Sequence, residues 1–180
     1  GRQTTDSTLP IEVTNDQQKM FITYAEADYT PDLDQGSPTT TYRLRIPYTQ
    51  RVYEITGVTS TSGLFLLADL KSQIAATTEI PYETLASGTT PQKRLLSSGQ
   101  SLFLDNTLNP LPPGQWDTLA LPYQHYQQAF TPGVTSAYYS GQIADSDFTT
   151  AGYVHFHGDA NWWIPSGTAV YPTSPATHFY

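Results

Sequence analysis

Apolar and polar residues alternate over several short stretches of the chain, with the two-residue period of a β-strand. In 42–46 this pattern places Tyr42, Leu44 and Ile46 on one face, and Pro47 is expected to end the strand or confine it to a sheet edge. Gly99 is expected to bend the longest stretch. The predicted strands cover 19–29, 42–46, 52–58, 92–106 and 124–130, with a closing strand at 168–171. Together they predict a mainly β fold.

Three segments show helical signals instead. Between residues 63 and 76, Leu64, Leu67, Leu70 and Ile74 recur on one helical stripe, and Ser62 can serve as the N-cap. Residues 132–140 follow a Thr-Pro pair and precede a glycine, which is the signature of a short helix. Residues 145–151 can form one more helical turn. We therefore expect one clear helix and two short ones within the β fold.

The segment 153–167 holds two of the four histidines and two of the three tryptophans. Read as a strand, it places Tyr153, His155, His157 and Asp159 on one face. One interpretation makes His155, His157 and Asp159 ligands of a zinc-like ion. The other lets the strand turn at Gly158-Asp159, so that the tryptophans pack back against it and Trp162 and Ile164 enter the core. The metal interpretation lacks a cluster of further Cys or His ligands.

Composition narrows the function classes. At 180 residues the chain suits one domain, which we assign to 19–180 after a flexible N-terminal segment at 1–18. Eight Lys and Arg against a net charge of −8 argue against a nucleic-acid partner. The chain has no cysteine and no apolar run long enough to span a membrane. It begins without Met, so we interpret it as a piece of a longer polypeptide.

Other candidate chemistry is sparse. Asp32 and Asp34 could belong to a calcium loop, but the bidentate acid that such a loop needs does not follow, and a solvated turn is the alternative. The basic cluster of Arg43, Arg45 and Arg51 is expected to be solvated and paired with nearby acids. No serine elbow, cysteine nucleophile or phosphate-binding glycine loop occurs. We therefore assign no catalytic residue and no cofactor.

The run from Gly152 to His155, followed by Gly158-Asp159-Ala160-Asn161-Trp162-Trp163-Ile164-Pro165-Ser166-Gly167, resembles a motif of a known family. The family is the SpvB/TcdB-like B component of bacterial insecticidal ABC toxin complexes, and the motif lies in its middle region, beside the Rhs-type YD-repeat shell. Further weak landmarks appear in the family's order, at 42–47, 53–57, 79–83, 92–96, 119–123 and 129–133. The chain departs from the motif at Phe156-His157, and it stops before any Tyr-Asp repeats.

The resemblance implies a β-rich, non-enzymatic segment of a secreted or cell-surface toxin component, and a virulence role. It would help to form the shell that encloses a cytotoxic C-terminal effector, and its partners would be the rest of the parent chain and the other toxin components. The structural motif would comprise Tyr153, His155, Gly158, Asp159, Asn161, Trp162, Trp163, Pro165 and Gly167.

Two other hypotheses stay open. A carbohydrate-binding β domain would use Trp162 and Trp163 as stacking platforms in an open groove, with Asp159 and Asn161 as hydrogen-bonding partners of a glycan. A metal-dependent hydrolase would use His155, His157 and Asp159. Fluorescence titration with sugars would test the first hypothesis, and metal analysis would test the second.

Overall fold

The computed structural model describes residues 20–34, 36, 41–60 and 63–173. The N-terminal segment assigned to 1–18 lies outside these residues. Strands dominate the described chain, and the predicted mainly β fold is confirmed. The elements are β1 (Ile22–Tyr29), β2 (Leu33–Asp34), β3 (Tyr42–Arg43), β4 (Pro47–Thr56), α3 (Leu67–Ala75), β5 (Thr78–Ile80), β6 (Gln92–Leu104), β7 (Leu121–Phe130), α4 (Pro132–Tyr139), α5 (Asp145–Thr150) and β8 (Trp162–Pro165).

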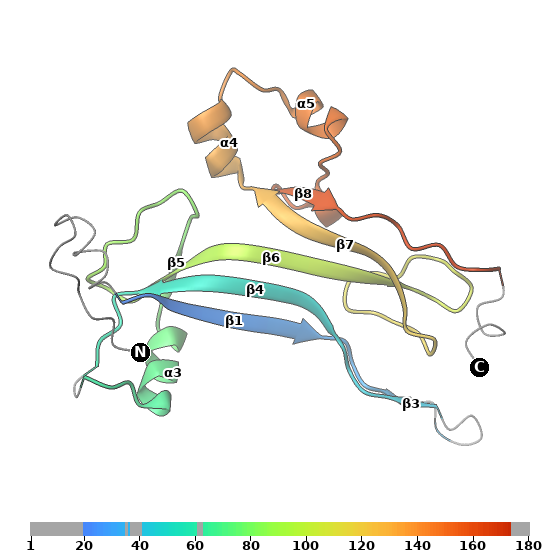
Figure 1. Cartoon of the computed structure of the whole chain (residues 1–180), viewed down its shortest axis with the longest axis horizontal. Helices are drawn as coiled ribbons and strands as arrows, with labels where there is room; N and C mark the ends of the chain where they lie inside the picture. The colour runs from blue at the N-terminus through green and yellow to red at the C-terminus, as the bar shows by residue number, and fades with distance from the viewer. Residues whose placement is uncertain (1–19, 35, 37–40, 61–62, 174–180) are drawn as a thin grey trace, which may run out of the picture.

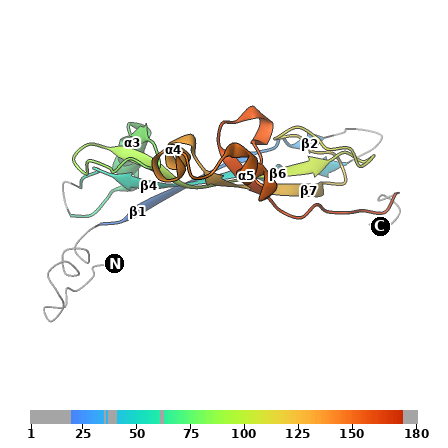
Figure 2. The same ribbon diagram turned by 90° about the horizontal axis from the view of Figure 1, so that it is seen from above.

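Six strands form one sheet in the order β1-β4-β6-β7-β8, with β5 pairing β6 off this path. Every pairing along the path is antiparallel, whereas β5 runs parallel to β6. Figure 1 shows the strands side by side, with β1 at one edge and β8 at the other. Seen edge-on in Figure 2, the sheet is a single thin layer. The helices are short and lie toward the ends and edges of this layer.

β6 is the long central strand, and its two halves have different neighbours on one side. Residues 92–94 pair with β5, and residues 99–104 pair with β7 on the same side. Gly99 lies where β7 approaches closely, since a Cβ there would lie 2.9 Å from the His125 ring, which would have to move. The pairing of β4 with β6 shifts register opposite Val52 and Tyr53, so the irregularity in β6 precedes the predicted bend at Gly99.

One core lies where α3 packs on the β1-β4-β6 end of the sheet. Tyr53, Ile55 and Val58 are buried there, and Leu70 and Ile74 of α3 pack against them. The helix begins at Leu67, four residues later than predicted, and its cap residue Leu66 makes no side-chain cap bond. Ser62, the predicted cap, lies outside the described residues. Half of the predicted stripe is therefore correct, since Leu64 and Leu67 are exposed.

A second core lies at the β7-β8 end. Leu102, Phe156 and Trp163 are buried together, with Tyr123 and Tyr126 against them. α4 and α5 fall close to the predicted 132–140 and 145–151. Thr131 caps α4 by accepting a bond from the Val134 amide, with Pro132 at the first helical position, as predicted. The sequence encodes the start of α4 locally, which is why this helix was predictable.

Two strand predictions are wrong. In 42–46 only Tyr42–Arg43 forms a strand, a short pairing with β2, and Pro47 opens the inner strand β4 instead of ending an edge strand. Proline is tolerated as the first residue of a strand, where Pro47 faces Tyr29 at a register shift of β1. The predicted strand 168–171 is irregular chain, although the Ala169 amide donates to the Tyr123 carbonyl.

Candidate functional site

In the segment 153–167 the predicted return of the tryptophans against the preceding residues is confirmed, but the predicted continuous strand over 153–159 is wrong. Val154 and Trp163 make a two-residue antiparallel bridge, each amide donating to the other's carbonyl at 2.9 Å. A tight turn then covers Phe156–Gly158, and it is not a regular 3₁₀ helix, because His157 (φ 49°) and Gly158 (φ 77°) both adopt left-handed backbone. Extended geometry is lost at these residues. The alternation that placed His155, His157 and Asp159 on one face therefore does not exist.

Asp159 organises the motif by accepting several hydrogen bonds. Oδ1 accepts from the Asn161 backbone amide at 2.8 Å. The Asn161 side-chain amide donates to both carboxylate oxygens, and the indole N–H of Trp163 donates to Oδ2 at 3.1 Å. This carboxylate satisfies the polar atom of a buried indole and fixes the turn into β8.

His155 is held by a backbone bond and by an aromatic ring. Its Nδ1 lies 3.0 Å from the Asn161 carbonyl oxygen, which can only accept, so Nδ1 carries the proton. The imidazole packs on Trp162 with ring centroids 3.9 Å apart. His157 instead lies edge-on to Phe156 at 4.3 Å. The two histidines thus bond to and pack on different partners within the motif.

Both tryptophans of the motif are buried. Trp162 is 5% exposed and Trp163 is 3% exposed. Trp162 stacks on Phe148 of α5 at 5.1 Å, whereas Trp163 packs on Phe156 at 5.6 Å. These two rings do not form the open groove that the carbohydrate hypothesis requires. The predicted core position of Trp162 is confirmed, but Ile164, two residues further along β8, is 38% exposed.

The described residues contain no group of three or more His, Cys, Asp or Glu able to hold a metal ion. The arrangement does not support the zinc hypothesis, since His155, His157 and Asp159 are directed to separate partners. The calcium loop has no support either. Asp32 binds Arg45, and Asp34 accepts a bond from the Gly36 amide.

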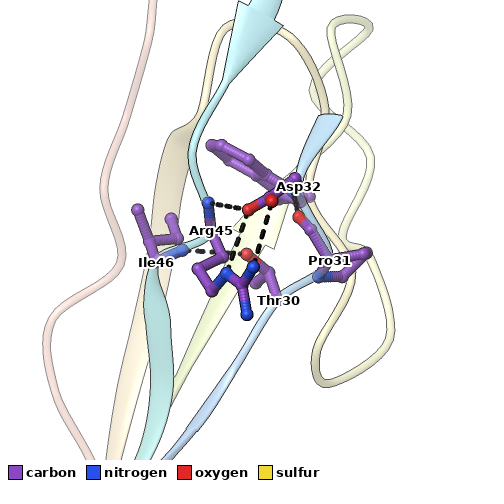
Figure 3. Close-up of polar contacts among 6 residues, drawn as sticks. Thr30, Pro31, Asp32, Arg45 and Ile46 are labelled. Atoms are coloured by element: carbon purple, nitrogen blue, oxygen red, sulfur yellow. Dashed lines mark hydrogen bonds and ion pairs between the residues drawn. The ribbon is translucent and has the colours of Figure 1, made fainter. Parts of the chain in front are cut away.

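The Asp32–Arg45 pair belongs to a clamp at the base of the β2-β3 extension (Figure 3). Arg45 donates from Nε and Nη2 to the two carboxylate oxygens, and its backbone amide adds a third bond at 2.8 Å. The Arg45 guanidinium lowers the pKa of Asp32. Thr30 accepts from the Ile46 amide beside it. The predicted pairing of the basic cluster with acids is therefore confirmed for Arg45.

A second ion cluster crosses β1 and β4, and its acids, Glu26 and Asp28, are not among the residues singled out from the sequence. Arg51 donates to Glu26 and Asp28, both at 2.8 Å, and the Tyr53 hydroxyl lies 3.2 Å from Glu26. The Arg51 bond lowers the pKa of Glu26, and burial raises the pKa of Tyr53 to about 12. The sequence does place Glu26 and Asp28 on one face of the predicted strand, because residues two apart in a strand share a face. The strand register that sets them opposite Arg51 was not visible.

No family model matches the chain, and no curated protein matches it. Among solved structures, the chain is similar to the one described as "Crystal Structure of TcdB2-TccC3-Cdc42". The match has a TM-score of 0.54 at 19% identity and covers 94% of this chain. It covers only 8% of that much longer chain. At this identity the likeness shows the fold, which this chain shares with a segment of a toxin-complex structure. No helix among the described residues is long and apolar enough to cross a membrane.

Proposed function

We propose that the chain is a structural, non-enzymatic segment of a toxin-complex component. It contributes sheet to the Rhs-type shell that encloses a cytotoxic C-terminal effector, and it helps to deliver this effector from a secreted or cell-surface particle. Its partners are the rest of its parent chain and the other toxin components. The fold similarity over 94% of the chain carries this proposal.

The sheet itself supports a scaffold role. Among the described residues β1 pairs only with β4, so this edge of the single layer is open to a further strand, whereas the β8 edge is partly covered by the bridge between Val154 and Trp163. An exposed strand edge normally needs a partner or a protecting device. Continuation of the sheet into neighbouring parts of the parent chain would supply that partner. The YD-repeat strands are the expected neighbours.

Apolar side chains at one end of the sheet point to the same conclusion. Phe21 and Leu85 are largely exposed, and with Met20 and Leu96 they line a groove of about 540 Å³. Contiguous exposed apolar surface of this kind marks an interaction site. In the proposed shell this groove is covered by another segment of the parent chain.

The motif contributes rigidity and performs no turnover in this proposal. The carboxylate oxygens of Asp159 accept hydrogen bonds from Asn161 and Trp163, and the His155 ring packs on Trp162. A general base needs reach to a substrate proton, and a nucleophile needs an adjacent base. The motif's polar groups are committed to holding the β7-β8 end together.

The test compares the isolated chain with its full-length parent. Phe21→Asp with Leu85→Asp should leave the melting temperature of the isolated chain nearly unchanged, because both side chains are already in water. In the parent the same pair should impair shell assembly and cargo delivery. Val170→Asp is the matched control, since Val170 is exposed but does not line the groove. A parent that assembles and delivers normally with both Asp substitutions would contradict the proposal.

The histidines provide a second test in the parent. His155→Gln with His157→Gln should reduce stability only modestly, through the hydrogen bond of His155, worth about 0.5–1.5 kcal/mol, and through the ring contacts with Trp162 and Phe156. Assembly and delivery should continue. If the double variant assembles normally but delivers nothing, these histidines have a chemical or pH-sensing task and the purely structural role is wrong.

A further inference from the structure

A hollow of about 410 Å³ is lined by residues from the end of β7, from α4 and α5, and from the segments that follow these helices. Four aromatic rings line it, from Phe130, Tyr139, Phe148 and Tyr153, together with the carboxylate-bearing Asp147. These residues come from four successive segments of the chain. The volume lies within the usual range for small-molecule sites, roughly 300–1,000 Å³. The scaffold role leaves this feature unexplained.

The rings meet Phe130 and Phe148 at steep angles, some of them edge to face and the others tilted. Phe130 lies 5.9 Å from Tyr139 at 80°, and 5.4 Å from Tyr153 at 59°. Phe148 meets Tyr139 at 82° and Tyr153 at 77°. Rings packed at steep angles expose faces in several directions, and an aromatic face carries the negative part of the ring quadrupole. Such a surface attracts a cation that can shed part of its water.

Charge in this part of the molecule has one sign. From Leu95 to the C-terminus the sequence contains five Asp and no Lys, Arg or Glu. Asp147 is fixed beside the hollow, because its Oδ2 accepts the Ala144 amide at 2.8 Å. No lysine or arginine from this half of the chain can therefore occupy the hollow. A complementary ligand has to bring its positive charge from outside.

We propose that this aromatic hollow binds an organic ammonium group. The ring faces of Tyr139 and Tyr153 would contact its alkyl substituents, and Asp147 would supply the opposite charge. The lysine ammonium is strongly hydrated and the arginine guanidinium is planar. A methylated ammonium is weakly hydrated and compact, so it suits aromatic faces best. The source is either a free quaternary ammonium compound or a methylated lysine side chain of a polypeptide.

The direct test is a titration of the 180-residue chain with choline chloride, followed by NMR shifts of aromatic protons. The neutral comparison is 3,3-dimethylbutan-1-ol, which has the same shape with carbon in place of the charged nitrogen. We expect saturable shifts with choline and roughly 2- to 30-fold weaker binding of the alcohol, the range of a cation–π contribution. Equal affinity for both compounds, or no saturable shift with choline, would overturn the proposal.

Variants locate the site. Tyr139→Ala should weaken choline binding by a similar factor. Tyr138→Ala should not, because Tyr138 is the next residue of α4 but is 67% exposed and does not line the hollow. Asp147→Asn keeps an oxygen that can accept the Ala144 amide, so the fold should survive while choline affinity falls. Unchanged affinity in both Tyr139→Ala and Asp147→Asn would place binding elsewhere and refute the assignment.

A final comparison separates the two sources. A peptide with one trimethyl-lysine should bind more tightly than the same peptide with unmodified lysine if the ligand is a polypeptide side chain. If free choline binds and the peptide does not, the source is a small quaternary ammonium compound. If neither binds, the ammonium assignment is wrong.

Discussion

Replacing Trp162 by alanine is the sharpest test of the β7-β8 core. The indole is 5% exposed and lies between the Phe148 ring at 5.1 Å and the His155 ring at 3.9 Å. A buried aromatic side chain removes roughly 150–250 Å² from water. At about 25 cal/mol per Å², this burial contributes roughly 4–6 kcal/mol. Because alanine keeps only the Cβ, we expect Trp162→Ala to cost about 3–5 kcal/mol, the range measured for such truncations.

The measurement is urea unfolding of the 180-residue chain, followed by far-UV circular dichroism because the substitution removes a fluorophore. The expected loss corresponds to a fall in melting temperature of roughly 6–20 °C for a chain of this size. Ile164→Ala is the matched control on the same strand, since Ile164 is 38% exposed, and it should cost less than about 1 kcal/mol. Trp162→Phe should fall between the two, because it keeps a ring against Phe148.

Equal free energies of unfolding in urea for Trp162→Ala and the wild type would refute this reasoning. It would mean that the indole is solvated in solution and that the stack on Phe148 does not form. The carbohydrate hypothesis would then regain its open platform at Trp162. A titration of tryptophan fluorescence with sugars would follow directly from that result.

Three further predictions concern single side chains. Gly133→Ala would place a Cβ against the Glu83 carboxylate, which accepts a hydrogen bond from the cap residue Thr131. The carboxylate would have to move and lose this bond, so thermal unfolding should show a stability loss of about 0.5–1.5 kcal/mol. Adding Glu83→Ala should relieve the clash. Gly167→Ala, which meets nothing within 4 Å, should be neutral. Asp159→Ala leaves the buried indole N–H of Trp163 without its acceptor and should cost about 1–3 kcal/mol in urea unfolding. Asp105 accepts bonds from the Asn109 and Thr107 amides that lower its pKa to about 2, so its stabilisation is present above pH 4 and disappears as the pH falls toward 2. Asp105→Asn should therefore flatten the wild-type decline in melting temperature across that window, and an unchanged decline would contradict the assignment.

Local patterns were enough to predict much of this fold. Thr131 and Pro132 encode the start of α4 within two residues, and alternation located β1, β6 and β7 closely. Such signals depend on neighbours in sequence, so they can be read without the tertiary structure. The helix at 67–75 was found for the same reason, although its start was placed too early because the leucine stripe continues into an exposed segment.

The candidate site shows where local patterns stop. His155, His157 and Asp159 alternate in sequence, yet left-handed backbone at His157 turns them toward different partners. The hydrophobic periodicity of a sequence does not indicate that one residue other than glycine adopts a positive φ. The sequence likewise placed Trp162 in the core correctly and Ile164 wrongly, because alternation puts both on one face, and only the packing of Phe148 from α5 on Trp162 distinguishes them.

The sequence by itself determined the class of fold, the three helices, the paired state of Arg45 and the importance of the tryptophan motif. Only the tertiary structure decided which acids meet Arg51, that Asp159 serves the indole of Trp163, and that four rings from β7, α4, α5 and the segment beyond them enclose one hollow. The physical reason is that strand alternation and helix caps depend on residues close together in the sequence. Register between strands and the packing of distant rings depend instead on how all the strands and helices assemble.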